Sequence, residues 1–230
     1  MAIPLTAAAS QKITAASQTT EDGCLGKFII NAITMVKMLG EDPCRSLPDP
    51  ERTEKNALTG SHETGGGLTQ QGREYVRQAQ QLGMIIDVSH ISDEAFWDIM
   101  DITDKPVVAS HSNSRGVCNV SRNLTDDMFR AICQSGGVAG FNQYPEFIGM
   151  DATLDTACDH ILHFLELDPE GRHIALGGDL DGCECLCNGF EGIQSYPIFA
   201  QRLLQRGVGE EIVERIFWKN ALGVMEQCCM

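Results

Sequence analysis

From Gly67 onward, the pattern of apolar and polar residues predicts strands that alternate with helices. Short apolar runs of the buried-strand type occur at 84–88, 106–109, 138–141 and 174–176. Helices are predicted to begin after Thr69, Ser92 and Thr125, because these hydroxyl residues can accept a hydrogen bond from the first helical turn. Further helical patterns cover 154–167, 197–205 and 210–227.

Four consecutive strand–helix units with short connections predict an α/β fold with a parallel sheet. Either a doubly wound sheet or a TIM-type barrel satisfies this pattern. A complete eight-stranded barrel needs about 250 residues, and this chain has 230. Its first 60 residues show few strand patterns: 28–39 is predicted to be helical, and 41–55, rich in proline and charge, to be a loop.

Composition and charge narrow the classes of partner. The formal net charge of −15 disfavours nucleic acid and anionic membrane surfaces, both of which attract clustered Lys and Arg. No apolar run reaches the length of a membrane span, and the N-terminal segment lacks the pattern of a signal peptide. We therefore expect a cytoplasmic protein whose ten cysteines are reduced.

Ionisable residues stand at the ends of three predicted strands. His90 follows the first apolar run, His111 the second and Asp179 the fourth. Parallel α/β sheets place their sites at the carboxyl ends of the strands. Two imidazoles and a carboxylate meeting there are typical of a catalytic zinc site, in which a bound water becomes the nucleophile.

Several segments resemble the renal (membrane) dipeptidase family in order and spacing. They are 67–73 (GLTQQGR), 82–90 (LGMIIDVSH), 106–112 (PVVASHS), 121–126 (SRNLTD), 136–138 (GGV) and 177–182 (GGDLDG). The resemblance runs from about residue 65 to 225. It implies a TIM-like barrel, incomplete at its N-terminus, that binds two zinc ions and hydrolyses the peptide bond of small dipeptides.

The resemblance also implies a role for individual residues. His90 and His111 correspond to the histidines that hold one zinc, and Asp179 to the aspartate that handles protons beside the bridging water. Arg122 is similar to the arginine that binds the substrate carboxylate or steadies the oxyanion. Glu21, in the segment TTEDG, is the candidate for the carboxylate that bridges the metals.

One family motif is missing. The family begins with a strand carrying His-x-Asp, which binds the other zinc, and this sequence contains no such motif. We therefore expect at most one zinc to be retained, in a chain made of a divergent N-terminal remnant (1–64) and a dipeptidase-like barrel portion (65–230). A shift of reading frame between about residues 27 and 55 is one hypothesis for the unmatched stretch.

Two alternatives to an active dipeptidase stay open. The first is a non-catalytic remnant of such an enzyme, or a chain that acts only with a partner; a homodimer is compatible with the sequence. The second is a thiol-based protein that uses the cysteines between Cys183 and Cys187. The loop residue His62 is a lesser candidate for contact with substrate.

Overall fold

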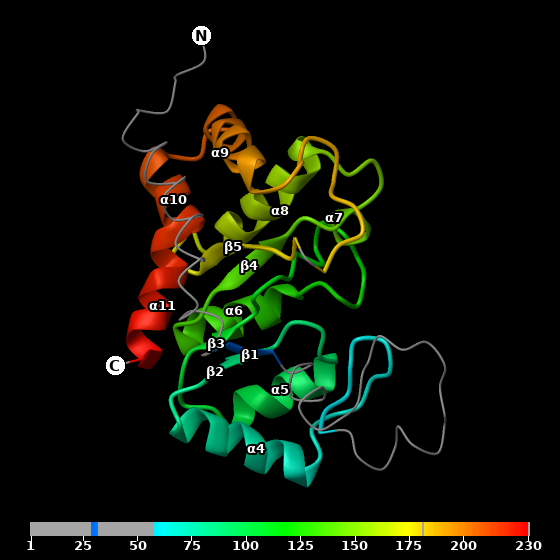
Figure 1. The fold of residues 1–230 in the computed structure, drawn as a ribbon, viewed down its shortest axis with the longest axis vertical. Helices are drawn as coiled ribbons and strands as arrows, with labels where there is room; N and C mark the ends of the chain where they lie inside the picture. Colours follow the sequence, from blue (N-terminus) through cyan, green and yellow to red (C-terminus); the bar gives the residue numbers. More distant parts are fainter. Residues whose placement is uncertain (1–28, 32–57, 181, 230) are drawn as a thin grey trace.

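The computed structural model describes residues 29–31, 58–180 and 182–229, and it has an α/β fold (Figure 1). Its strands are β1 (Ile29–Asn31), β2 (Ile85–Asp87), β3 (Val107–Val108), β4 (Ala139–Asn142) and β5 (Ile174–Gly178). Its α-helices are α4 (Gln70–Gln81), α5 (Asp93–Ile102), α6 (Asp126–Ser135), α7 (Pro145–Ile148), α8 (Leu154–Leu167), α9 (Tyr196–Gln205), α10 (Glu210–Glu214) and α11 (Asn220–Cys229). A 3₁₀ turn at Ile193–Ser195 precedes α9, and a π-helical turn at Arg215–Lys219 joins α10 to α11.

The five strands run parallel and follow one another in space. β2 pairs with β1 on one side and with β3 on the other, and β4 pairs with β5. A bridge between Ala109 and Ala139 joins the two groups, with a bond of 2.9 Å from Ala109 N to Val138 O. All carboxyl ends of the strands therefore lie at the same end of the molecule.

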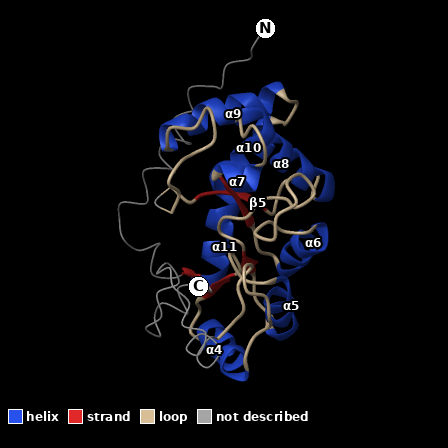
Figure 2. Ribbon diagram, turned by 90° about the vertical axis from the view of Figure 1, so that its right-hand side faces the viewer, coloured by secondary structure: helices blue, strands red, loops and turns tan. Residues whose placement is uncertain are grey.

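The helices begin where the sequence predicts. Thr69, Ser92 and Thr125 accept hydrogen bonds from the backbone N–H three residues later, so they cap α4, α5 and α6. Helices α5, α6 and α8 lie along one side of the strands (Figure 2). This is the arrangement that short connections between parallel strands produce.

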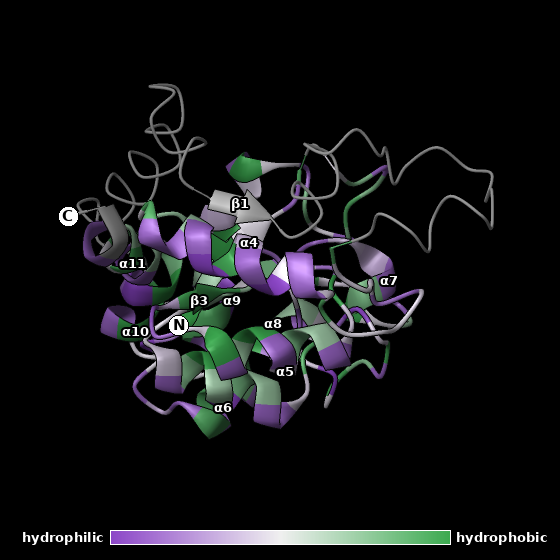
Figure 3. Cartoon of the chain, turned by 90° about the horizontal axis from the view of Figure 1, so that it is seen from below, coloured by the Kyte–Doolittle hydropathy of each residue, from purple (hydrophilic) through white to green (hydrophobic). Residues whose placement is uncertain are grey.

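Neighbouring residues along β2, β3, β4 and β5 face two different apolar layers. Ile86, Val107, Ala139 and Ile174 belong to the main core, where the strands meet the helices. Their strand neighbours form a second cluster with α11: Ile85, Val108, Val138, Ala175 and Val224. Helix α4 is mostly hydrophilic along its length (Figure 3), and it buries only a narrow stripe that includes Val76 and Ala79.

Two sequence predictions need correction. The segment 28–39 was expected to be helical, but Ile29–Asn31 forms β1 in parallel pairing with β2. The predicted helix at 210–227 is interrupted by the π-helical turn. The first difference comes from the pairing of β1 with β2, which local periodicity does not record. Within the described ranges, no helix is long and apolar enough to cross a membrane.

Candidate active site

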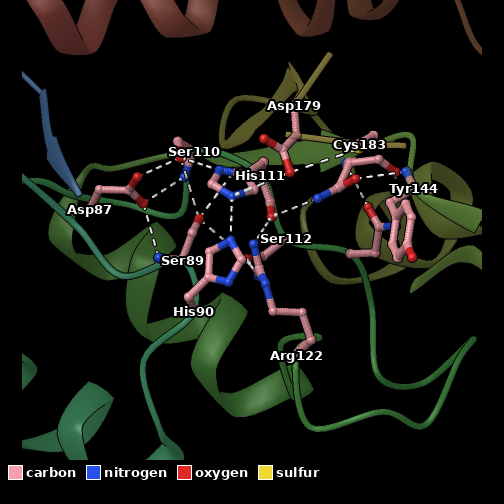
Figure 4. A network of polar contacts seen from close by, with 12 residues as sticks. Asp87, Ser89, His90, Ser110, His111, Ser112, Arg122, Tyr144, Asp179 and Cys183 are labelled. Atoms are coloured by element: carbon pink, nitrogen blue, oxygen red, sulfur yellow. Dashed lines mark hydrogen bonds and ion pairs between the residues drawn. The ribbon is translucent and has the colours of Figure 1, made fainter. Parts of the chain in front are cut away.

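The three ionisable residues at the strand ends lie together in the structure (Figure 4). The Nε2 atoms of His90 and His111 are 2.8 Å apart, and His111 Nε2 is 3.8 Å from Asp179 Oδ2. One potential ligand atom from each residue lies within 4.8 Å of the others. The sequence prediction that these residues share one site therefore agrees with the geometry.

Two of these residues have an unusual backbone conformation. His90 has φ of 74° and Asp179 has φ of 55°, in the left-handed region that residues with a Cβ atom seldom adopt. Such a conformation costs on the order of 1–3 kcal/mol and persists where the surrounding structure imposes it. Asp179 directly follows β5, and His90 stands three residues after the end of β2.

A relay of hydrogen bonds fixes the ring of His111. Ser110 Oγ donates to Asp87 Oδ2 at 2.5 Å and contacts His111 Nδ1 at 2.6 Å. Because a hydroxyl has one hydrogen, His111 Nδ1 must donate to Ser110. The lone pair of His111 is then on Nε2, which faces His90 and Asp179.

The electrostatic surroundings keep His111 neutral. Burial, followed by the positive charge of Arg122, lowers its pKa to about 3. Burial raises the pKa of Asp87, although hydrogen bonds from Ser110 and Ser89 oppose that shift. A neutral imidazole with a fixed tautomer is the form that binds a metal ion.

Arg122 lies beneath this site and is only 4% exposed. Its guanidinium donates to Ser112 Oγ at 2.6 Å and to the carbonyl of His111 at 2.7 Å. Burial lowers its pKa to about 10, against the opposing effect of Asp87 and Asp179. Arg122 therefore holds the backbone of a site histidine in addition to placing positive charge beside the site.

Asp179 is half-buried, and Cys183 is its neighbour. Burial raises the pKa of Asp179, while Arg122 and hydrogen bonds from Cys183 and Asn142 lower it. The Cys183 thiol donates to Asp179 Oδ2 at 3.8 Å. Burial and the Asp179 charge raise the pKa of Cys183 to about 11, so this thiol lacks the lowered pKa of a reactive cysteine. That result weighs against the thiol-based alternative.

The remaining candidates fall in different places. Glu21 lies outside the described residues. His62 does approach the site. Its backbone N–H donates to the backbone carbonyl of His90 at 2.9 Å, and the centroids of the two rings are 5.7 Å apart. Sequence reasoning missed Asp87 and Ser110. The signal for Asp87 was a carboxylate within an otherwise apolar strand.

The residues present fit a zinc ion. Two imidazole nitrogens and a carboxylate oxygen form a donor set that zinc prefers, and a set of three leaves a coordination position for water. The Nε2 atoms of His90 and His111 face each other at 2.8 Å, so both are placed to bind the same cation.

Parallel strands that end in a cluster of two histidines and one carboxylate describe an α/β protein with a candidate metal centre. Residues 51–229 match the model of one family, membrane dipeptidase (peptidase family M19). The chain belongs to this family.

Curated relatives and solved structures agree with this assignment. An uncharacterized dipeptidase of Schizosaccharomyces pombe is 36% identical over 74% of this chain, and the dipeptidase tcpJ of Claviceps purpurea is 34% identical over 70%. The chain spans 42% and 38% of the length of these two relatives. A metallopeptidase from Rhodobacter sphaeroides, solved with a phosphinate mimic of L-Ala-D-Ala, superposes with a TM-score of 0.68 at 28% identity, covering 75% of this chain and 50% of that one.

Proposed function

We propose that this chain is a zinc-dependent dipeptidase that hydrolyses the peptide bond of small dipeptides. The observation that carries the proposal is the convergence of His90, His111 and Asp179 at the ends of parallel strands. The relative that binds a mimic of L-Ala-D-Ala supports a dipeptide as the substrate class.

Each site residue has a proposed role. His90 and His111 hold the zinc, with Glu21 as a further carboxylate ligand. A zinc ion bound there would supply a water of lowered pKa and polarise the scissile carbonyl. Asp179, whose pKa is raised, takes the proton released at that position and returns it to the leaving amine.

Arg122 is the proposed anchor for the substrate carboxylate. Its planar guanidinium can bind a carboxylate through two parallel hydrogen bonds. In the structure, one of its N–H groups donates to Ser112 Oγ, and that bond must exchange for a substrate carboxylate to bind. Its Nε atom is buried without a hydrogen-bond partner in the described part of the chain.

We propose that residues 65–230 form part of a TIM-like barrel and that 1–64 are a divergent remnant of its first strands. The strand face opposite α5, α6 and α8 supports this idea, because it is apolar and borders a cavity of about 200 Å³ that α11 also lines. The inward-facing side chains of a barrel form such an apolar layer.

The second candidate function is that of a non-catalytic remnant. It is favoured by one observation: the sequence has no His-x-Asp motif, so the ligands of the family's other zinc are missing. On this account the site at His90 and His111 can hold at most one zinc, and the second metal's contribution to the reaction is lost.

Hydrolysis of L-Ala-D-Ala with added zinc separates the two functions. An active dipeptidase releases alanine at a rate far above that of His111→Ala. His163→Gln serves as the matched control, because His163 lies on α8 and pairs with Asp126 instead of the site. If the unmodified chain is no faster than His111→Ala, the non-catalytic function is the correct one.

A further inference from the structure

A second cluster of metal-ligating side chains lies at the opposite end of the sheet. Cys133 is in the last turn of α6, Asp168 caps the C-terminus of α8, and His173 directly precedes β5. One potential ligand atom from each lies within 4.8 Å of the others. Since β5 separates His173 from Asp179, the two clusters are roughly 20 Å apart at a strand rise of ~3.3 Å per residue.

Hydrogen bonds position two of these side chains. His173 Nδ1 donates to the carbonyl of Gly137 at 2.8 Å, so Nε2 is the ring nitrogen left to bind a cation. The backbone N–H of His173 donates to Asp168 Oδ2 at 2.8 Å. Histidines that bind a metal ion through one ring nitrogen usually donate the N–H of the other nitrogen to an acceptor such as a carbonyl.

The chemistry of the donor set selects the metal. A thiol sulfur, an imidazole nitrogen and a carboxylate oxygen together suit zinc better than magnesium or calcium, which prefer oxygen ligands. All three side chains are half-buried, so a fourth position can be filled by water.

We propose that Cys133, Asp168 and His173 bind a zinc ion that joins the C-terminal ends of α6 and α8 to the start of β5. This site is structural: it lies away from the strand ends that carry the candidate active site. The proposal does not depend on the dipeptidase function.

Cobalt(II) is a direct probe, since a cobalt–thiolate bond gives a charge-transfer band in the near ultraviolet. The unmodified chain should show this band, and Cys133→Ser should lose it. Cys158→Ser is the matched control, because Cys158 is a buried helix cysteine outside the cluster. Cys183→Ser and His111→Ala test whether the band comes from the candidate active site instead.

Thermal unfolding with zinc adds a readout that does not need the thiol variant to fold. A ligand that binds only the native state raises the unfolding temperature. Zinc should raise the Tm of His111→Ala, and this increase should shrink or vanish in the double variant His111→Ala/His173→Gln. The proposal is overturned if the cobalt band is absent, survives Cys133→Ser or disappears in Cys183→Ser, or if zinc raises the Tm of both variants equally.

Discussion

Residues with a positive φ occur at both ends of the sheet, but the residue types that adopt this conformation differ between the ends. At the amino ends of the strands, helices turn into strands through glycines in the left-handed region, such as Gly83 with φ of 77° and Gly136 with φ of 80°. At the carboxyl ends, Gly178 has φ of 71°, and the residues His90 and Asp179, which carry a Cβ atom, occupy the same region. In the described part of the chain, the third residue other than glycine with a positive φ is Asp151, in the connection from β4 to α8.

This difference shows which turns serve only the fold. Where a turn has no chemical task, glycine adopts a positive φ without steric cost. Where a side chain is needed, the chain keeps histidine or aspartate and accepts the strain. The carboxyl end also buries Asp87 and Arg122, whose desolvation costs stability. We interpret these costs as the signature of the functional end.

The largest expected effect is the loss of the metal at the carboxyl end. His111→Ala should lower dipeptide hydrolysis by at least about a thousandfold, because a catalytic zinc supplies several kcal/mol of transition-state stabilisation. Steady-state release of alanine measures this effect. Unchanged activity would contradict the proposal that His111 binds the catalytic metal.

A smaller effect should follow when the relay behind His111 is cut. Ser110→Ala leaves the ring free to adopt the wrong tautomer, so zinc affinity should fall by about ten- to a hundredfold. Competition with a zinc chelator provides the measurement. Ser135→Ala, at the amino end, removes a hydroxyl that bonds Val107 N and Ile132 O and should leave zinc affinity at the site unchanged. Equal losses in the two variants would show that the ends are not distinct.

A buried histidine away from both clusters predicts a pH effect. Burial lowers the pKa of His160, whose neutral ring accepts from Ser114 N at 3.1 Å and donates to Ile148 O at 2.9 Å. The unfolded chain binds a proton below about pH 6.5 and the native chain does not, so stability falls as the pH drops below that value. The slope from this group approaches about 1.4 kcal/mol per pH unit.

Urea unfolding of the metal-free chain between pH 7 and 5 tests that effect. The amide of His160→Gln can keep both hydrogen bonds. This variant should reduce the slope of the free energy of unfolding against pH by up to the contribution of one proton, about 1.4 kcal/mol per pH unit. His62 and His111 shift in the same direction, so some dependence should remain. An unchanged slope in His160→Gln would contradict the assignment.

The smallest effect concerns the glycine turns. Gly136→Ala should lower the free energy of unfolding by about 1–2 kcal/mol, because alanine resists a left-handed backbone. An added Cβ would meet no atom closer than 3.9 Å, so conformation and not crowding decides the result. Gly223→Ala, inside α11 with open space, should instead stabilise by roughly 0.5–1 kcal/mol. Equal shifts in both variants would contradict this explanation.

Much of the fold was predictable, because its signals are local. The hydroxyl caps at Thr69, Ser92 and Thr125 mark helix starts through contacts within one turn. The convergence of His90, His111 and Asp179 was predictable because parallel strands bring their carboxyl ends together. Neither inference required knowledge of side-chain conformation.

The missed features depend on contacts across the sheet. The role of Ser110 rests on the register of β2 against β3, which places Asp87 within hydrogen-bond distance of Ser110, the second residue after β3. The short strand β1 is defined by its pairing with β2 and not by its own periodicity. The buried position of Arg122 likewise comes from tertiary packing, so the sequence indicated its chemistry but not its contacts.

The most direct test of the central claim is the zinc content of the His173→Gln chain with and without His111→Ala. The first variant keeps only the site at the strand ends. We predict about one zinc per chain in the single variant and a loss of that zinc in the double variant, since a site with a two-histidine core cannot hold the metal tightly with one. Equal zinc contents would contradict the assignment of His90, His111 and Asp179 as a metal centre.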